Sequence, residues 1–339
     1  MQGDNIKALF KDFTCEVDGV KYHFGAGGLH ACKPGVYRNV LDLDVAGYYP
    51  NIVLSLGIHP GHFDERFSTV YQWLIDERKR VGKKTKEGTA LKLAANSVFG
   101  NLSNKYSFVY DNQALLSVTL AGQLSILMLI EQLLKIPNLS VIQVNTDGFS
   151  LDVLPQYEDH LRQVVSWWEG FTRFEMEYAH FDRLWIADVN NFVADTGDYL
   201  KLKGRYATEV FSHQDASSMV VPKAAVEHMT KGTDIETFIR NHKDPFDFCL
   251  RAKTTGKDKL VLRYKQLNAD VKQQKITRYY VSKTGGSLVK VAPLKEGHVV
   301  GQYKRANKLS DEFFNSVMDA IGPDVWDERI HTKNKSKYE

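Results

Sequence analysis

The sequence predicts an α+β fold built on an antiparallel sheet, and three observations carry this prediction. Residues 139–144 and 149–154 are short runs rich in Val, Ile and Leu on either side of a turn, as the strands of a β-hairpin are. Residues 40–45 alternate apolar and acidic side chains, which is the pattern of a strand. Residues 65–81 place apolar side chains at helical spacing, and residues 89–99 form a second helical stretch.

Composition bounds the number of domains and the class of protein. The chain has 339 residues, more than one core usually holds, so two or three subdomains are expected. Its 43% hydrophobic and 25% charged residues are those of an ordinary globular protein. The cysteines Cys15, Cys32 and Cys249 are widely spaced and odd in number, which argues against a disulfide framework or a zinc site and favours a reducing, cytoplasmic location. No signal-peptide core and no uninterrupted apolar run of about 18 residues is found, so no membrane partner is expected.

The net charge of +3 conceals two strongly basic segments. Residues 78–92 carry seven Lys and Arg against one acidic residue, and residues 251–290 carry eleven against two. Such clusters are the electrostatic footprint of a polyanion-binding protein, although a charge run taken singly also suits a solvated face. Two basic segments around a pair of carboxylates favour nucleic acid as the partner.

The carboxylate pair consists of Asp44, at the end of the alternating strand, and Asp147, in the hairpin turn. Turns favour Asp for conformational reasons, so Asp147 alone predicts only a solvated turn. Asp42 and Asp44 lie on one face of their strand, and neighbouring carboxylates repel unless cations or solvent separate them. Two Asp on adjoining strands are the usual means of holding two Mg²⁺ ions for phosphoryl or nucleotidyl transfer. Asp44 and Asp147 are therefore the candidate metal ligands and catalytic residues.

The helical stretches form a second candidate surface. A Lys-rich turn at residues 82–88 joins them into a protruding helical hairpin, and Gly100 is expected to cap the second helix. Lys92, Asn96 and Phe99 share one face of that helix at spacing i, i+4, i+7. A cation, an amide and a ring are better suited to a phosphate, a sugar and a base than to a core.

The rest of the chain carries weaker patterns. Three glycines among residues 25–28 permit a close backbone approach, or simply a tight surface loop. The remaining expected elements are an amphipathic helix at 156–171, strands at 173–178, 184–194 and 199–206, a helix at 234–242, a hairpin formed by 277–282 and 287–291, and a helix at 311–321.

Five stretches resemble characteristic motifs of the family B (α-like) DNA polymerases, in their phage-type branch. The stretches follow one another along the chain in the same order as the motifs do in the family. Residues 44–50 (Asp-Val-Ala-Gly-Tyr-Tyr-Pro) are similar to motif A, residues 92–100 to motif B and residues 145–148 to motif C. Residues 27–30 resemble the Tyr-x-Gly-Gly region that precedes motif A, and residues 201–206 resemble the Lys-x-Tyr region that grips the primer.

The resemblance implies a right-hand polymerase fold with an antiparallel palm sheet, helical-hairpin fingers and an α/β thumb. Residues 1–60 would then form an N-terminal segment and the first part of the palm, 61–105 the fingers, 106–230 the rest of the palm and 231–339 the thumb.

The implied activity is that of a DNA-directed DNA polymerase, which adds deoxynucleotides to a primer 3′ end by two-metal nucleotidyl transfer. Its cofactor would be two Mg²⁺ ions, with Mn²⁺ as a substitute, and its partners would be primer–template DNA and deoxynucleoside triphosphates.

The metal ligands would be Asp44, Asp147 and the carbonyl of Val45. The nucleotide would be held by Arg78 and Lys92 at its phosphates, by Tyr49 beneath its sugar, where a 2′-hydroxyl is excluded, and by Asn96 and Phe99 beside its base. DNA would be contacted by Gly27, Gly28, Lys201, Lys203 and Tyr206 and, on charge and chain order alone, by Arg263, Lys265, Lys272, Lys275, Arg278 and Lys283.

Several positions depart from the family pattern. Asn145 stands where motif C has its first Asp, Gly148 and Gly47 stand where motifs C and A have Ser, and Phe99 stands where motif B has Tyr. We expect these changes to weaken catalysis without removing the site. The alternative is a non-catalytic DNA-binding or scaffold subunit; a reverse transcriptase or RNA polymerase fits motif B and the Tyr49-Pro50 ending less well.

A family exonuclease region, with its Asp-x-Glu motif, is not found before residue 27. The sequence is therefore expected to be the polymerase half of a split enzyme, a truncated form of a longer polymerase or a naturally minimal polymerase, with a separate exonuclease chain or other replisome proteins as partners. Only a short stretch separates motif A from motif B, which favours a nucleic acid primer over a protein one. A phage-encoded chain would act in the host cytoplasm.

Overall fold

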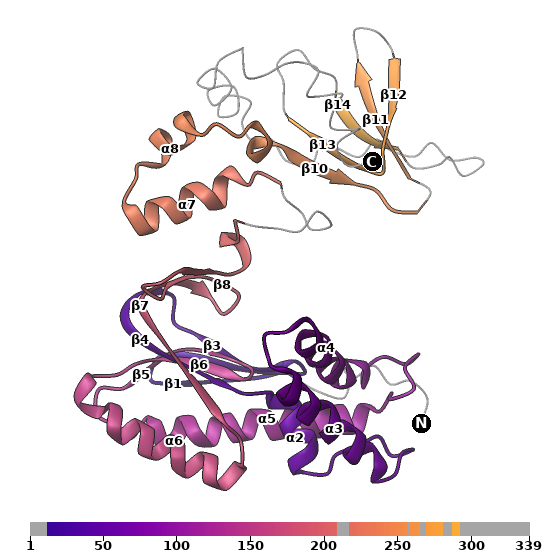
Figure 1. Cartoon of the computed structure of the whole chain (residues 1–339). Coiled ribbons are helices and arrows are strands. Elements are labelled where there is room, and N and C mark those ends of the chain that lie inside the picture. The colour runs from indigo at the N-terminus through magenta and orange to yellow at the C-terminus, as the bar shows by residue number, and fades with distance from the viewer. Residues whose placement is uncertain (1–11, 209–216, 257, 265–268, 281–286, 292–339) are drawn as a thin grey trace. The chain divides into compact units, whose positions relative to one another are not determined.

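The computed structural model (Figure 1) divides into two compact units, residues 1–203 and 204–339. The residues that it describes are 12–208, 217–256, 258–264, 269–280 and 287–291.

In residues 12–203, the first unit is built on a nine-stranded sheet in which every neighbouring pair is antiparallel, in the order β1-β2-β3-β5-β6-β4-β7-β8-β9. This confirms the antiparallel sheet. The strands are β1 (Phe13–Val17), β2 (Val20–Gly25), β3 (Gly28–Cys32), β4 (Gly35–Val45), β5 (Ser140–Asn145), β6 (Gly148–Asp152), β7 (Met176–Asp188), β8 (Asn191–Asp195) and β9 (Leu200–Leu202).

The expected acidic strand is the end of β4, in the middle of the sheet. Leu41, Leu43 and Val45 are buried in the main core, whereas Asp42 and Asp44 alternate with them and face the other side of the sheet. The expected hairpin is also confirmed, because β5 and β6 pair with each other and β6 pairs with β4. These pairings bring residues 44–50 and 145–148 together.

Three helices supply most of the helical residues of the main core. α2 (Tyr48–Ser55) follows β4 directly, and α5 (Asn112–Leu133) and α6 (Glu158–Thr172) run along one face of the sheet (Figure 1). The sequence predicted α6 but not α5. α5 is the single helix of the described residues long and apolar enough to cross a membrane, and half of its most apolar window is buried inside the protein.

α3 (Arg66–Val81) and α4 (Lys86–Asn101) form the expected helical hairpin, and the Tyr71 hydroxyl on α3 donates a hydrogen bond to the Ala95 carbonyl on α4 at 2.7 Å. The predicted limits of α4 were wrong at both ends. The helix begins three residues early because the Thr85 side chain accepts a hydrogen bond from the Gly88 backbone N–H and so caps it. It also continues through Gly100 instead of ending there.

Beyond the hairpin, the predicted division of the outer strands needs correction. The expected strands at 173–178 and 184–194 are replaced by one long strand, β7, followed by β8. The residues between the two expected strands stay extended because they pair with β4, which lies alongside β7 for most of its length.

The described residues of the second unit form α7 (Val220–Lys231), α8 (Ile235–Asn241) and five short strands. α8 confirms the helix predicted at 234–242, with Asp234 as its N-cap. The predicted hairpin of residues 277–291 was wrong, because β13 (Ile276–Tyr279) pairs with β10 (Leu250–Lys253) and β14 (Ser287–Val291) pairs with β11 (Lys259–Tyr264). Its turn and the helix predicted at 311–321 lie outside the described residues. β12 (Ala269–Gln273) lies on the other side of β11.

Candidate active site

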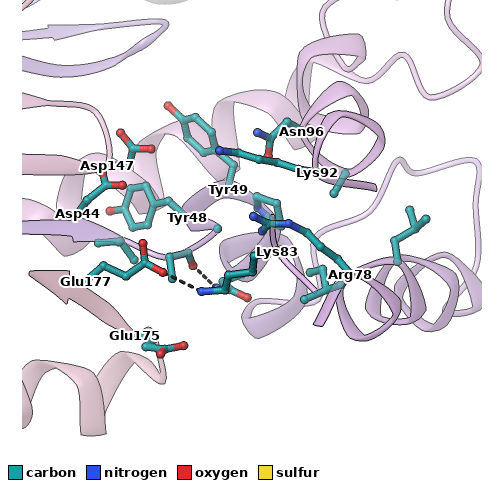
Figure 2. Close-up of a pocket in the computed structure, with 18 of the residues that line it drawn as sticks. Asp44, Tyr48, Tyr49, Arg78, Lys83, Lys92, Asn96, Asp147, Glu175 and Glu177 are labelled. Carbon is teal, nitrogen blue, oxygen red and sulfur yellow. Dashed lines mark hydrogen bonds and ion pairs between the residues drawn. The ribbon is translucent and has the colours of Figure 1, made fainter. Parts of the chain in front are cut away.

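A cavity of about 410 Å³ opens between the end of β4, the start of α2 and the inner faces of α3 and α4. Figure 2 shows Asp44 and Asp147 together at one end, with Lys92 and Asn96 on α4 and Arg78 on α3 across the cavity from them. Asp44, Tyr49, Arg78, Lys92, Asn96, Phe99 and Asp147 all line it. The structure therefore brings together residues that the sequence places up to about a hundred positions apart.

The two carboxylates are held together by backbone contacts. The backbone N–H of Val45 donates a hydrogen bond to the Asp147 carbonyl at 2.8 Å, and Asp44 lies directly opposite Gly148 in the β4–β6 pairing. A Cβ on Gly148 would lie 2.8 Å from the Oδ1 of Asp44 and from the carbonyl oxygen of Leu43. Gly148, where the related motif has Ser, is thus required by the close approach of β4.

Burial and neighbouring charges disfavour the simultaneous ionisation of both carboxyl groups. Burial, followed by the charges of Asp147 and Asp42, raises the pKa of Asp44 to about 7, against an opposing effect of Lys201. Burial also raises the pKa of Asp147, against its own backbone N–H and the charges of Lys92 and Lys203. A divalent cation would relieve this repulsion, and carboxylate oxygens are the ligands that Mg²⁺ prefers.

These residues fit a metal as a partial ligand set. Among the described residues, no three His, Cys, Asp or Glu side chains gather closely enough to hold an ion by themselves. Two carboxylates and a backbone carbonyl would leave coordination positions for water and for substrate oxygens, as Mg²⁺ sites that bind phosphate substrates commonly do.

The turn into α2 places two tyrosines. Gly47 adopts φ +59° between β4 and α2, a left-handed conformation that Ser would adopt less readily, which explains the departure from motif A. Tyr48 is buried and its hydroxyl donates a hydrogen bond to the Gly122 carbonyl at 2.5 Å. Tyr49 stacks on Phe99 with 3.9 Å between the ring centroids, and its hydroxyl donates to the Gly27 carbonyl at 3.0 Å.

The helical hairpin supplies cations. The Nε of Arg78 is buried without a hydrogen-bond partner in the described part of the chain. Its N–H is therefore available to donate a hydrogen bond to an anionic oxygen of a bound ligand. Lys83, in the turn after α3, forms an ion pair with Glu177 on β7, with Nζ and Oε1 2.8 Å apart (Figure 2).

Sequence reasoning missed Lys83 and Glu177 as members of the site, although both line the cavity together with Glu175. Glu177 lies opposite Asp44 in the β4–β7 pairing. Glu residues at alternate positions 175 and 177 carry a strand pattern, but only the register against β4 places Glu177 opposite Asp44.

The structure places the predicted DNA-contacting glycines beside the carboxylate hairpin. Gly28 adopts φ +137°, and a Cβ on it would lie 2.8 Å from the Oγ1 of Thr146. The backbone N–H of Thr146 donates a hydrogen bond to the Leu29 carbonyl at 2.8 Å. The glycine loop therefore supports the turn that carries Asp147.

The two predicted DNA-contacting lysines of the first unit behave differently. Lys201 forms an ion pair with Asp42 at 3.6 Å, whereas the Lys203 ammonium has no ion-pair partner among the described residues. Both line a second cavity of about 430 Å³ that also contains Asp44 and Asp147.

Of the basic residues predicted in the second unit, Arg263 pairs with Asp270 at 2.7 Å and the Lys275 ammonium donates to the Gly256 carbonyl at 3.1 Å. Lys272 and Arg278 lie on β12 and β13. Tyr206 also belongs to this unit, while Lys265 and Lys283 lie outside the described residues.

No protein-family model matches the chain, and no curated protein matches it. Among solved structures, the family B DNA polymerase from the hyperthermophilic archaeon Pyrobaculum calidifontis is similar, with a TM-score of 0.50 and 16% sequence identity. The match covers 97% of this chain and 48% of that polymerase, so the chain spans about half the length of its structural neighbour. The fold of this chain is thus similar to that of a family B DNA polymerase.

Proposed function

We propose that this chain is a template-directed DNA polymerase of the phage-type branch of family B, adding deoxynucleotides to a primer 3′ end. The observation that carries the proposal is the position of Asp44 beside Asp147 in a cavity whose facing wall carries Arg78 and Lys92. Carboxylates at one end and cations at the other are what a magnesium-bound triphosphate requires.

In this proposal Asp44, Asp147 and the Val45 carbonyl would hold two Mg²⁺ ions. When bound, the ions would lower the pKa of the primer hydroxyl and neutralise the triphosphate. Arg78 would grip phosphate oxygens with its forked guanidinium, and Lys92 would supply a point charge.

The stacked rings of Tyr49 and Phe99 would form the floor beneath the sugar and base of the nucleotide. A ring fixed on both its face and its hydroxyl cannot readily move aside for a 2′-hydroxyl, so deoxynucleotides are the favoured substrate. Asn96 lies on the same wall of the cavity and would contact the nascent base pair.

The proposed partners follow from the same reasoning. The likeness to a DNA polymerase supports DNA as the bound polymer. Gly28 and Lys203 lie beside the carboxylate hairpin, and Gly27 lies beside Tyr49, so all three are proposed to meet a primer–template there. An exonuclease on another chain and further replisome proteins are proposed as additional partners.

The test is extension of a labelled primer annealed to a DNA template, with Mg²⁺ and either deoxynucleotides or ribonucleotides. We expect extension that requires Mg²⁺ and a complementary deoxynucleotide. DNA binding without extension, in Mg²⁺ or Mn²⁺, would instead favour a non-catalytic DNA-binding subunit. Preferential use of ribonucleotides would contradict the assignment as a DNA polymerase.

A further inference from the structure

Lys201 lies on the edge strand of the sheet, and its side chain extends toward β4. It belongs to β9, which β8 and β7 separate from β4. Its ammonium lies 5.3 Å from the ring centroid of Phe181 on β7 and 5.8 Å from that of Phe192 on β8. Beyond these rings it reaches the Oδ2 of Asp42 at 3.6 Å. Two aromatic faces therefore hold the side chain in one direction, toward the carboxylates of β4.

Asp42, the partner of Lys201, is largely buried, with 15% of its side chain exposed. The hydroxyl of Ser150 on β6 donates a hydrogen bond to its Oδ1 at 2.5 Å, and the amide of Gln143 on β5 donates to that hydroxyl at 3.0 Å. A polar chain of Gln143, Ser150, Asp42 and Lys201 thus runs from strand to strand across the sheet, and three of its members line the second cavity together with Asp44 and Asp147. Asp42 precedes Asp44 by two residues and shares its face of the strand.

A carboxylate in this position needs a cation. A buried charge that loses its partner destabilises the fold more than the intact pair stabilises it. Lys201 is the cation that the structure places within ion-pair distance of Asp42 in the described residues. Its neighbour Lys203 has no ion-pair partner in the same part of the chain and lines the same cavity, so it provides a matched comparison.

We propose that Lys201 is a positioning residue: it is the internal counter-ion of Asp42, and through β4 it fixes the orientation of the Asp44 carboxylate, instead of contacting a DNA phosphate. This proposal rests on the proposed polymerase function, and it revises the role that sequence similarity assigns to Lys201. The proposal also gives different roles to Lys201 and Lys203, although both belong to the stretch, residues 201–206, that resembles the primer-gripping region.

The salt dependence of DNA binding tests the first half of the proposal. Removing one lysine that touches a phosphate reduces the slope of log affinity against log salt by about 1. For primer–template binding without nucleotide, measured by fluorescence anisotropy, we expect Lys201→Met to keep the wild-type slope and Lys203→Met to lower it. A slope reduced by Lys201→Met as much as by Lys203→Met would overturn the proposal.

A double-mutant cycle tests the second half. We expect Lys201→Met to lower the kcat of single-nucleotide addition about tenfold while the KM for the nucleotide changes less than about twofold, with Lys201→Arg restoring most of the kcat. Because Asp42→Asn removes the charge that Lys201 balances, the double variant Asp42→Asn with Lys201→Met should retain more kcat and more thermal stability than the two single effects combined would leave. Independent effects of the two substitutions would overturn the proposal.

The stability arm of the cycle does not depend on catalysis. If the wild type extends no primer, the proposed function fails, and with it the role of Lys201 toward Asp44. The coupling of residues 42 and 201 in thermal stability would still decide whether they form an internal ion pair.

Discussion

The ring of Tyr49 lies nearly parallel to that of Phe99, with an interplanar angle of 15° and 3.9 Å between the centroids, and its hydroxyl is bound by the Gly27 carbonyl. Tyr49 belongs to α2, Phe99 belongs to α4 and Gly27 lies in the loop before β3, so residues of three separate segments are in contact at the Tyr49 side chain. Through this hydrogen bond the loop that contains Gly27 contacts Tyr49, the residue proposed to lie beneath the sugar of the nucleotide.

This arrangement predicts that Tyr49 sets the preference for deoxynucleotides. Tyr49→Ala should lower the discrimination against ribonucleotides by about a hundredfold, because the space for a 2′-hydroxyl opens. Tyr49→Phe keeps the ring and the stack, so it should preserve most of the discrimination and lose only the hydrogen bond to Gly27. The measurement is kcat/KM for matched deoxynucleotides and ribonucleotides. Unchanged discrimination in Tyr49→Ala would show that the sugar lies elsewhere.

Gly148 is predicted to be irreplaceable although the related motif carries Ser. An added Cβ would meet the Asp44 carboxylate and the Leu43 backbone, so Gly148→Ala should destabilise the fold by about 1–3 kcal/mol and lower kcat as Asp44 is displaced. Gly148→Ser should do the same. Gly170→Ala on α6 is the control, because a Cβ there meets nothing within 4 Å. Higher activity in Gly148→Ser than in the wild type would contradict this reading of the close contact.

The raised pKa of Asp44 predicts a pH-dependent stability when divalent metals are removed. Between about pH 4 and pH 7 the folded chain keeps on Asp44 a proton that the unfolded chain has released, so the free energy of unfolding should fall as pH rises through this window. Thermal denaturation in EDTA would show this as a slope that is smaller in Asp44→Asn. Added Mg²⁺ should stabilise the wild type most toward pH 7 and above, where both carboxylates are ionised. Parallel pH profiles of the two proteins would contradict the prediction.

Arg78 is predicted to bind the triphosphate through the geometry of its guanidinium. Arg78→Lys keeps the charge but loses the forked donors, so the KM for the nucleotide should rise about tenfold with a smaller change in kcat. Arg80→Lys on the same helix is the control, because Arg80 is largely exposed and paired with Glu77. Equal effects of the two substitutions in steady-state kinetics would remove Arg78 from the site.

The parts of the fold that the sequence predicted are those whose signals are local. Turn residues define the β5–β6 hairpin, alternation defines the end of β4, and Asp234 caps α8 through its own side chain. The proximity of Asp44 and Asp147 could be predicted for the same reason, because Asp44 lies near the end of β4 and Asp147 lies in the β5–β6 turn, and both elements have clear sequence patterns.

The parts that could not be predicted depend on pairing between distant segments. β7 is continuous because β4 lies alongside it, and β13 and β14 pair with different strands instead of with each other. α5 is apolar around much of its surface, so it lacks the amphipathic spacing that revealed α6. The ion pair of Lys201 could not be predicted either, because its partner Asp42 lies on a strand that the sequence places 159 positions earlier.

Asp147 is predicted to be a metal-binding carboxylate of a polymerase active site. The decisive comparison is between Asp147→Asn and the wild type in Mg²⁺-dependent primer extension and in primer–template binding. We predict that the substitution abolishes extension while leaving the affinity for DNA within about threefold, because it removes a metal ligand and no DNA contact. Extension at the wild-type rate by Asp147→Asn would show that this carboxylate does not bind a metal needed for catalysis.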